Sequence, residues 1–202
     1  MLNDENQVEV CTWGPEEACQ DCELSYSLNC RMDYRALAYF GAIFLPGGIS
    51  AAAGMIRGGF TWGLLLWAGY MLVFFNIWEA KVLCSHCPYY AGRGQTLRCP
   101  ANYGVFKIWP YQPGPMSRSE KIQFLVGAGL LLMLPWPFLA LGGEYLLLGL
   151  TAAANGSFVF SLVRTVCPRC VNFSCPLNRV PVEIQRSYLA KNPQIKEAWT
   201  GS

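Results

Sequence analysis

The chain has 202 residues, of which 53% are hydrophobic and only 14% are charged, and its formal net charge is +2 at pH 7. This composition is too apolar for an ordinary soluble domain, and we expect no nucleic-acid partner. The first hypothesis is therefore an all-α integral membrane protein that lies in a cell's inner or cytoplasmic membrane, with the lipid bilayer around it.

Residues 1–33 are predicted to form an acidic, cysteine-rich tail. The first 30 residues contain seven acidic side chains and no Lys or Arg, whereas the rest of the chain is net basic. Two interpretations stay open, because such a tail can fold back onto the basic loops or simply remain solvated. The opening MLNDENQVEV lacks the basic and apolar regions of an export signal, so we expect the N-terminus to be retained.

Four apolar windows follow the tail, and each is long enough for a transmembrane helix, which needs about 20 residues. The windows are Ala36 to Met55, Phe60 to Val82, Ile122 to Leu141 and Tyr145 to Val163. Only a few residues separate the windows within each pair, so they form two hairpins, residues 34–87 and 122–178. The predicted fold is a bundle of four transmembrane helices.

The positions of Lys and Arg indicate the orientation of this bundle, because these residues accumulate in short loops on the cytoplasmic side. If the N-terminus lies inside, Arg57 is the one Lys or Arg residue left outside. We therefore expect both termini in the cytoplasm. All ten cysteines then face a reducing compartment, where clustered thiols favour metal sites over disulfides. In the opposite orientation, the ten cysteines would be expected to form five disulfide bonds.

A predicted cytoplasmic loop, residues 88–121, joins the two hairpins, and a C-terminal cytoplasmic tail, residues 179–202, follows the second. The loop is rich in Gly, Pro, Tyr and Trp, a composition that suits the bilayer surface. Ser117 and Glu120 match a capping box, so the third helix is predicted to begin before it enters the membrane. The C-terminal tail has apolar residues at loosely helical spacing, which favours a short helix.

The ends of the second and fourth helices carry a duplicated pattern. KVLCSHC, Lys81 to Cys87, matches RTVCPRC, Arg164 to Cys170, and CPAN from Cys99 matches CPLN from Cys175. Each hairpin thus ends in a CxxC unit followed by a CPxN unit. Two hairpins in the same orientation are related by an axis along the membrane normal, so we expect the two CxxC units to meet at one mouth of the bundle.

The cysteines form the predicted cytoplasmic metal-binding segments. The candidate metal ligands are Cys11, Cys19, Cys22, Cys30, Cys84, Cys87, Cys99, Cys167, Cys170 and Cys175, of which the last six are also the candidate cofactor-binding residues. A CxxC unit lets both sulfurs reach one metal. The Cys-Pro pairs favour an iron–sulfur cluster, because ferredoxin motifs end in Cys-Pro. Zinc is the alternative, with His86 as a further candidate ligand, and thiol redox chemistry is the third interpretation.

Two Cys-Pro motifs resemble those of a known class of protein. SHCPYY, Ser85 to Tyr90, and FSCPLN, Phe173 to Asn178, are similar to the motifs of membrane iron–sulfur proteins of polyferredoxin type, which belong to periplasmic nitrate reductase and nitrous oxide reductase systems. The spacing here is CxxCP and CxxxxCP, where that family has CxxxCP. The resemblance implies four-helix proteins with iron–sulfur centres just inside the membrane.

Two functions from different classes follow from these patterns. The first is a membrane-embedded electron-transfer protein, whose iron–sulfur centres take electrons from a cytosolic partner and pass them to a quinone or a membrane protein. The alternative is a zinc-stabilised membrane anchor or scaffold subunit that recruits a cytosolic partner, and a thiol-based metal sensor or carrier is third. No pattern identifies a catalytic residue, so the sequence does not establish that the protein is an enzyme.

Overall fold

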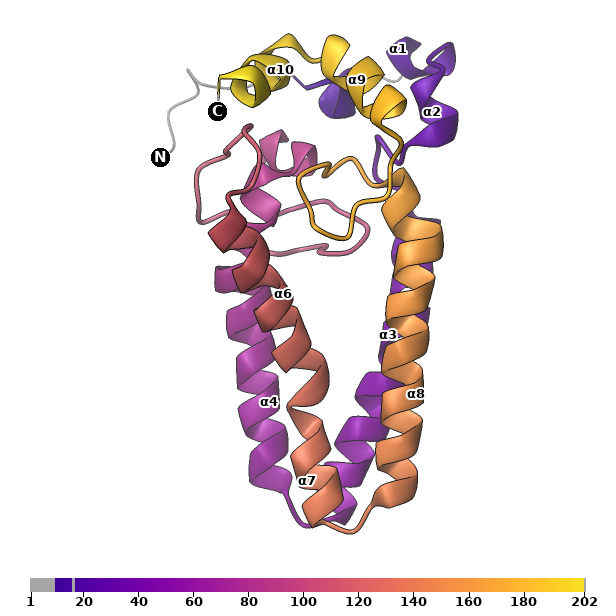
Figure 1. Ribbon diagram of the computed structural model, residues 1–202, viewed down its shortest axis with the longest axis vertical. Coiled ribbons are helices and arrows are strands. Elements are labelled where there is room, and N and C mark those ends of the chain that lie inside the picture. The colour runs from indigo at the N-terminus through magenta and orange to yellow at the C-terminus, as the bar shows by residue number, and fades with distance from the viewer. Residues whose placement is uncertain (1–9, 16, 202) are drawn as a thin grey trace.

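The computed structural model describes residues 10–15 and 17–201, and in this part the chain forms helices and no named strand (Figure 1). Within the described residues, four helical spans are long and apolar enough to cross a membrane. They are Tyr34–Arg57, Thr61–His86, Arg118–Leu141 and Tyr145–Arg169. Each span covers nearly all of the predicted window and extends beyond it, so the all-α class and the four helices are confirmed.

The spans differ in how they are built. The first is the single helix α3 (Tyr34–Arg57), and the third consists of α6 (Arg118–Met133) and α7 (Pro135–Leu141). The second consists of α4 (Thr61–Val73), the π-helical segment η3 (Phe74–Trp78), α5 (Glu79–Val82) and the 3-10 turn η4 (Cys84–His86). The fourth consists of α8 (Tyr145–Ser161), the π-helical segment η6 (Leu162–Val166) and the 3-10 turn η7 (Cys167–Arg169). The second and fourth spans therefore both pass through a π-helical segment before a CxxC unit, and such segments are frequent at functional sites.

Side-chain caps mark the beginnings of the first and third spans. Asp33 Oδ1 accepts a hydrogen bond from the amide of Arg35, with a distance of 2.8 Å. The amide of Ser117 donates to Glu120 Oε2 at 2.7 Å, and the amide of Glu120 donates to Ser117 Oγ at 3.2 Å. The predicted capping box is confirmed, and it satisfies amides that a starting helix leaves without a partner.

Helices from different hairpins pack side by side. Figure 1 shows α3 beside α8 and α4 beside α6, with the two pairs converging at α7. Between α3 and α8, Ser50 Oγ and Thr151 Oγ1 form a hydrogen bond of 2.9 Å. Between α4 and α6, the hydroxyl of Tyr70 donates to the carbonyl of Gly127 at 2.9 Å. Because each hairpin supplies one helix to each pair, neither hairpin alone forms the bundle.

At one end of the bundle the chain forms a cap, which we define as residues 10–15, 17–33, 87–117 and 170–201 (Figure 1). Its short helices are η2 (Cys11–Trp13), α1 (Glu17–Gln20), α2 (Leu24–Ser27), η5 (Pro88–Ala91), α9 (Val182–Ala190) and α10 (Pro193–Thr200). Leu28 of the tail, Leu97 of the loop and Tyr188 of α9 share one apolar core. Residues 10–15 and 17–33 of the tail therefore fold back, as one of the two interpretations has it, whereas residues 1–9 and Glu16, with four of the acidic side chains, lie outside the described residues.

The loop between the hairpins contributes to this core. Tyr89 and Tyr90 are each only 4% exposed, although the aromatic composition of the loop suits the bilayer surface. The reason is that the tail covers them: the hydroxyl of Tyr89 donates to the carbonyl of Asn29 at 2.7 Å. Aromatic side chains that would favour a lipid headgroup layer in an isolated loop instead pack inside the cap.

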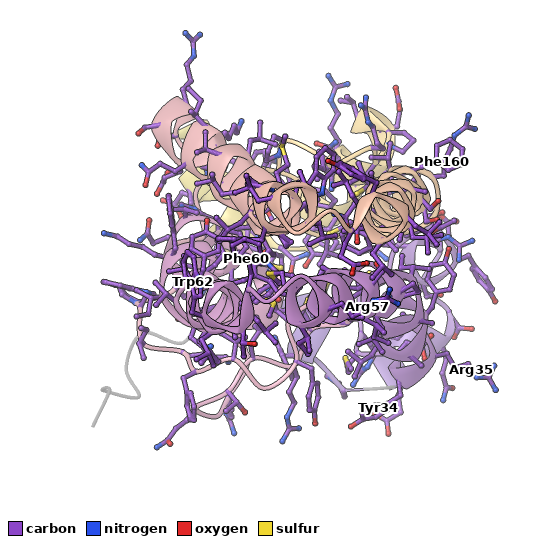
Figure 2. All side chains as sticks on the ribbon, turned by 90° about the horizontal axis from the view of Figure 1, so that it is seen from below. Tyr34, Arg35, Arg57, Phe60, Trp62 and Phe160 are labelled. Carbon is purple, nitrogen blue, oxygen red and sulfur yellow. The ribbon has the colours of Figure 1, made fainter. Side chains whose placement is uncertain are left out.

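The opposite end of the bundle has only short connections. A Cβ atom built on Gly142 would lie 2.8 Å from Gly58 Cα, so the two connections approach closely there. Arg57 Nε pairs with Glu144 Oε1 at 3.2 Å. In Figure 2, which views this end, Arg57 lies at the near end of the molecule, whereas Phe160 lies at the periphery of the bundle and is 63% exposed. Exposed apolar side chains along the helices suit contact with lipid.

We expect Gly127→Ala to destabilise the bundle, because a Cβ atom there would lie 2.6 Å from Cε2 of Phe74, which is 1% exposed. Overpacking costs about 1–3 kcal/mol, which exceeds the gain of about 0.5–1 kcal/mol from replacing Gly by Ala in a helix. The midpoint of thermal unfolding, followed by circular dichroism in detergent, should fall. Gly129→Ala on the same helix meets no atom within 4 Å and should not lower it. Equal effects of the two substitutions would contradict the packing of α6 on η3.

Candidate functional site

The two CxxC units adopt the same backbone structure. In each, a 3-10 turn begins at the first cysteine, and the second cysteine is extended, with φ −88° and ψ 136° at Cys87 and φ −81° and ψ 128° at Cys170. The amide of the second cysteine donates to the carbonyl of the first, at 2.9 Å in the first unit and 3.4 Å in the second. Together with the π-helical segment before each unit, this equivalence supports the duplication indicated by the sequence.

Each CPxN unit returns to the CxxC unit of its own hairpin. The side-chain amide of Asn102 donates to Cys84 Sγ at 3.3 Å, and that of Asn178 donates to the carbonyl of Cys170 at 2.8 Å. A further asparagine connects the hairpins, because Asn172 Nδ2 of the second donates to the Leu83 carbonyl of the first at 3.1 Å. Asparagine side chains thus hold both units together at the mouth of the bundle.

We call the cysteines of these units the hairpin set: Cys84, Cys87, Cys99, Cys167, Cys170 and Cys175, all of them buried or partly buried. Burial raises the pKa of Cys99 and Cys170 to about 11 and the pKa of Cys175 to about 12. Burial also raises the pKa of Cys87, and negative charge on Cys99 and Cys170 raises it further. Thiols from the two hairpins therefore lie within electrostatic reach of each other.

Backbone amides are directed at several of these sulfurs. Cys87, Cys99, Cys170 and Cys175 each accept a hydrogen bond from the amide two residues further along the chain. Each of these bonds favours the thiolate and therefore acts against the rise in pKa that burial causes. Amides aimed at sulfur are also what a metal-bound thiolate requires around it.

The other four cysteines, Cys11, Cys19, Cys22 and Cys30, form the tail set, and all are partly buried. The sulfurs of three of them accept hydrogen bonds from side chains, one from the tail itself and two from the C-terminal part of the chain. Asn192 Nδ2 donates to Cys11 Sγ at 3.2 Å, Lys191 Nζ donates to Cys22 Sγ at 3.2 Å, and an Arg31 guanidinium nitrogen donates to Cys19 Sγ at 3.6 Å. The connection between α9 and α10 thus supplies polar partners to the tail.

The thiols of the tail set differ in acidity. Burial, together with negative charge on Cys11, Cys22 and Cys19, raises the pKa of Cys30 to about 12. Burial also acts to raise the pKa of Cys22, but the hydrogen bond and positive charge of Lys191, with backbone amides, outweigh it, and the pKa is lowered. The other three thiols of the tail set therefore lie within electrostatic reach of Cys30.

Two buried tyrosines lie within electrostatic reach of cysteines from both sets. Tyr188 is 0% exposed, and its hydroxyl forms a hydrogen bond of 2.9 Å with Thr12 Oγ1. Burial raises the pKa of Tyr188, and negative charge on Cys11, Cys30 and Cys87 raises it further. Burial likewise raises the pKa of Tyr89, with contributions from Cys99, Cys87, Cys170 and Cys30. Negative charge on cysteines of either set would therefore raise the pKa of each tyrosine.

His86 does not complete a site with these thiols. Its Nδ1 is 2.8 Å from the carbonyl oxygen of Gly114, and its Nε2 is 3.3 Å from Glu120 Oε1. Both ring nitrogens are engaged away from the sulfurs, so the suggestion that His86 is a zinc ligand is not supported. Among the described residues, no group of three or more His, Cys, Asp or Glu side chains is arranged to hold one metal ion. All ten cysteines are described and none is in a disulfide, and their assignment as ligands stays a prediction.

Two polar residues of the site, Lys191 and Asn192, were not predicted from the sequence. Lys191 and Asn192 lie in a segment without cysteines, and nothing in its composition relates it to the tail set. The sequence did point to Asn102, because it is the last residue of a duplicated CPxN unit. Glu79 is 8% exposed, and its Oε2 has no hydrogen-bond partner among the described residues. It lies within electrostatic reach of Cys99 and Cys175.

Comparison with protein-family models, with curated proteins and with solved structures found no match. The resemblance to polyferredoxin-type proteins therefore depends on the two Cys-Pro motifs alone. The function has to be argued from the residues of this chain.

In metal-free protein, Cys22 should be alkylated faster than Cys30 at about pH 8, because the thiolate is the reactive form and Cys22 has the lower pKa. Lys191→Gln removes a hydrogen bond and a positive charge, so it should raise the pKa of Cys22 and slow its alkylation. Lys196→Gln changes an exposed lysine of α10 and should leave the rate unchanged. Mass spectrometry of peptides after timed exposure to iodoacetamide measures these rates. Equal rates for Cys22 and Cys30 would contradict the described tail set.

Proposed function

We propose that this protein is a membrane-embedded electron-transfer protein that holds cysteine-ligated iron–sulfur centres on the cytoplasmic face. The observation that carries the proposal is that six of the ten cysteines lie in or against one apolar core, at the end of four helices long enough to span a membrane; the six are Cys11, Cys22, Cys30, Cys84, Cys87 and Cys99. Electrons would enter from a cytosolic partner and leave to a quinone or a membrane protein. An iron–sulfur cluster, when bound, supplies one-electron chemistry that none of these side chains has by itself.

The chemistry of the hairpin set fits such a centre. A [4Fe–4S] cluster takes four cysteine thiolates, and the set offers six from two hairpins. The amides directed at Cys87, Cys99, Cys170 and Cys175 would stabilise thiolates once their protons are lost. The high pKa values of the buried thiols imply that binding must release protons, so loading would be favoured as the pH rises.

The tail set fits a second centre. It has four thiols, the number that one cluster takes, and it is surrounded by the cations Lys191 and Arg31. A cluster with four thiolate ligands carries net negative charge, and nearby cations raise its reduction potential. Tyr89 and Tyr188 lie within electrostatic reach of cysteines from both sets, so two centres would share these tyrosines as neighbours.

A zinc-stabilised scaffold is the second candidate, and the tail set is the observation that favours it. Here four thiols lie among short helical turns, η2, α1 and α2, and a structural zinc ion typically organises such a segment through four cysteines. In that case the cap would serve as a surface that recruits a cytosolic protein, and the four helices would anchor it.

Purified without exposure to oxygen, the full chain should be brown, absorb broadly near about 400 nm and contain iron and acid-labile sulfide. Replacing the four tail cysteines by serine should remove one centre and roughly halve the iron content, because the hairpin set keeps its own ligands. Metal analysis, sulfide assay and electron paramagnetic resonance of the reduced protein measure these outcomes. Replacing Ser27 of α2 by alanine is the control and should leave the iron content unchanged. Zinc without iron in the intact chain would rule out the electron-transfer proposal.

We further propose that the cap faces the cytoplasm. In the topology predicted from the sequence, Arg57 is the one Lys or Arg residue on the other side of the membrane, and basic residues accumulate on the cytoplasmic side. A green fluorescent protein fused after residue 202 should therefore fluoresce, whereas an alkaline phosphatase fused at the same place should be inactive. The same two reporters inserted after Gly143, in the opposite connection, should give the reverse result. Phosphatase activity from the C-terminal fusion would contradict this orientation.

A further inference from the structure

A groove opens on the cap beside the tail set. Its volume is about 1200 Å³, and it is lined by residues from three separate segments, among them Cys11, Trp13, Gly92, Arg93, Arg98 and Lys191. The tail, the loop between the hairpins and the connection between α9 and α10 therefore build it together. The groove borders the tail set, because its wall includes Cys11 and also Lys191, whose Nζ donates to Cys22 Sγ.

The charged side chains that line the groove are all basic. Arg93, Arg98 and Lys191 are exposed, and none of the described lining residues is acidic. Lys107 lies nearby, since its Nζ contacts the Gly92 carbonyl. Burial, with positive charge on Arg98, lowers the pKa of Lys107 to about 8, as expected in a basic environment. Basic side chains around a concave surface raise the local concentration of anions.

An aromatic ring is fixed at the wall of the groove. Trp13 Nε1 donates to the Pro88 carbonyl at 3.1 Å, and the ring packs edge-on against Tyr89 with centroids 6.5 Å apart. Gly92 permits this position, because a Cβ atom there would lie 2.1 Å from the indole. Trp13 is still 36% exposed. A held, partly exposed indole offers a surface on which a planar ring can stack.

The backbone of the groove also suits an anion. Gly94 has φ +103°, and a Cβ atom there would meet nothing within 4 Å, so the chain leaves open space beside two arginines. Pro193 and Gln194, at the N-terminus of α10, form another part of the wall. Pro193 has no amide N–H, so the amide of Gln194 is the first that this end of α10 can offer to a negative group such as phosphate.

From these features we propose that the groove binds a small phosphate-bearing ligand with a planar ring, the class to which nucleotides and dinucleotides belong. Small-molecule pockets usually measure about 300–1,000 Å³, so the groove is far larger than an inorganic ion requires and large enough for a dinucleotide. Arg93, Arg98 and Lys191 bind the phosphates, and Trp13 stacks on the ring. This inference does not depend on the metal content of the protein.

The test uses the full chain in lipid nanodiscs and titrates it with ATP, with NADH and with inorganic pyrophosphate by calorimetry. At least one nucleotide should bind saturably to one site, and pyrophosphate should bind at least about tenfold more weakly because it lacks the ring. Arg98→Ala removes a charged hydrogen-bond donor and should lower the nucleotide affinity by about tenfold. The matched control Arg186→Ala, an exposed arginine of α9 outside the groove, should leave it unchanged.

Four results would overturn the proposal. The first is the absence of saturable binding of ATP and NADH, and the second is an equal loss of affinity in Arg98→Ala and Arg186→Ala. The third is saturable binding of poly-L-glutamate without binding of either nucleotide, which would assign the groove to an acidic protein. The fourth is nucleotide binding only after deletion of residues 1–9, which would show that the intact chain does not bind a nucleotide.

Discussion

Burial of thiols inside an apolar core is the constraint around which the cap is organised. Cys84 and Cys87 belong to the same core as Tyr188 and Leu97, with Cys30 packed against it. A thiolate in such surroundings is costly unless donors face it, and burial raises the pKa of Cys87 and Cys30 accordingly. The donors are present: backbone amides serve the hairpin set, and Lys, Arg and Asn side chains serve the tail set. One structure therefore provides both the packing that holds the cap together and the polar surroundings that a metal-bound thiolate needs.

The two hairpins supply nearly equivalent backbones but unequal surroundings. The turn geometry at Cys87 and Cys170 is alike, yet Asn102 donates to a sulfur and Asn178 donates to a carbonyl. The buried carboxylate of Glu79 has Leu162 at the matching position of the second hairpin, as the alignment of the two CxxC units places it. The two hairpins thus have similar backbones but place different side chains around the thiols of the hairpin set. A centre held there would therefore have asymmetric surroundings.

The sequence was informative where structure depends on local pattern. The apolar windows predicted the four spans, and Ser117 with Glu120 predicted the start of α6, because hydropathy and capping act over a few residues. The burial of Tyr89 and Tyr90 was not predictable, because it depends on the tail folding over them. The partners of the tail set were missed for the same reason: Asn192 contacts Cys11 across 181 positions. His86 was misleading, because its position between two cysteines suggests a ligand, whereas its ring faces Gly114 and Glu120.

The pairing of α3 with α8 and the contact between Cys11 and Asn192 impose an order on biosynthesis. Helix α3 is synthesised before α8, so it can form its main packing contact only after α8 has been made. The tail cysteines, although translated at the start, gain their hydrogen-bond donors only after the segment around residue 191 has been made. Any cofactor that depends on the finished tail set must therefore be inserted late, and until then its thiols are accessible to oxidants, stray metals and chaperones.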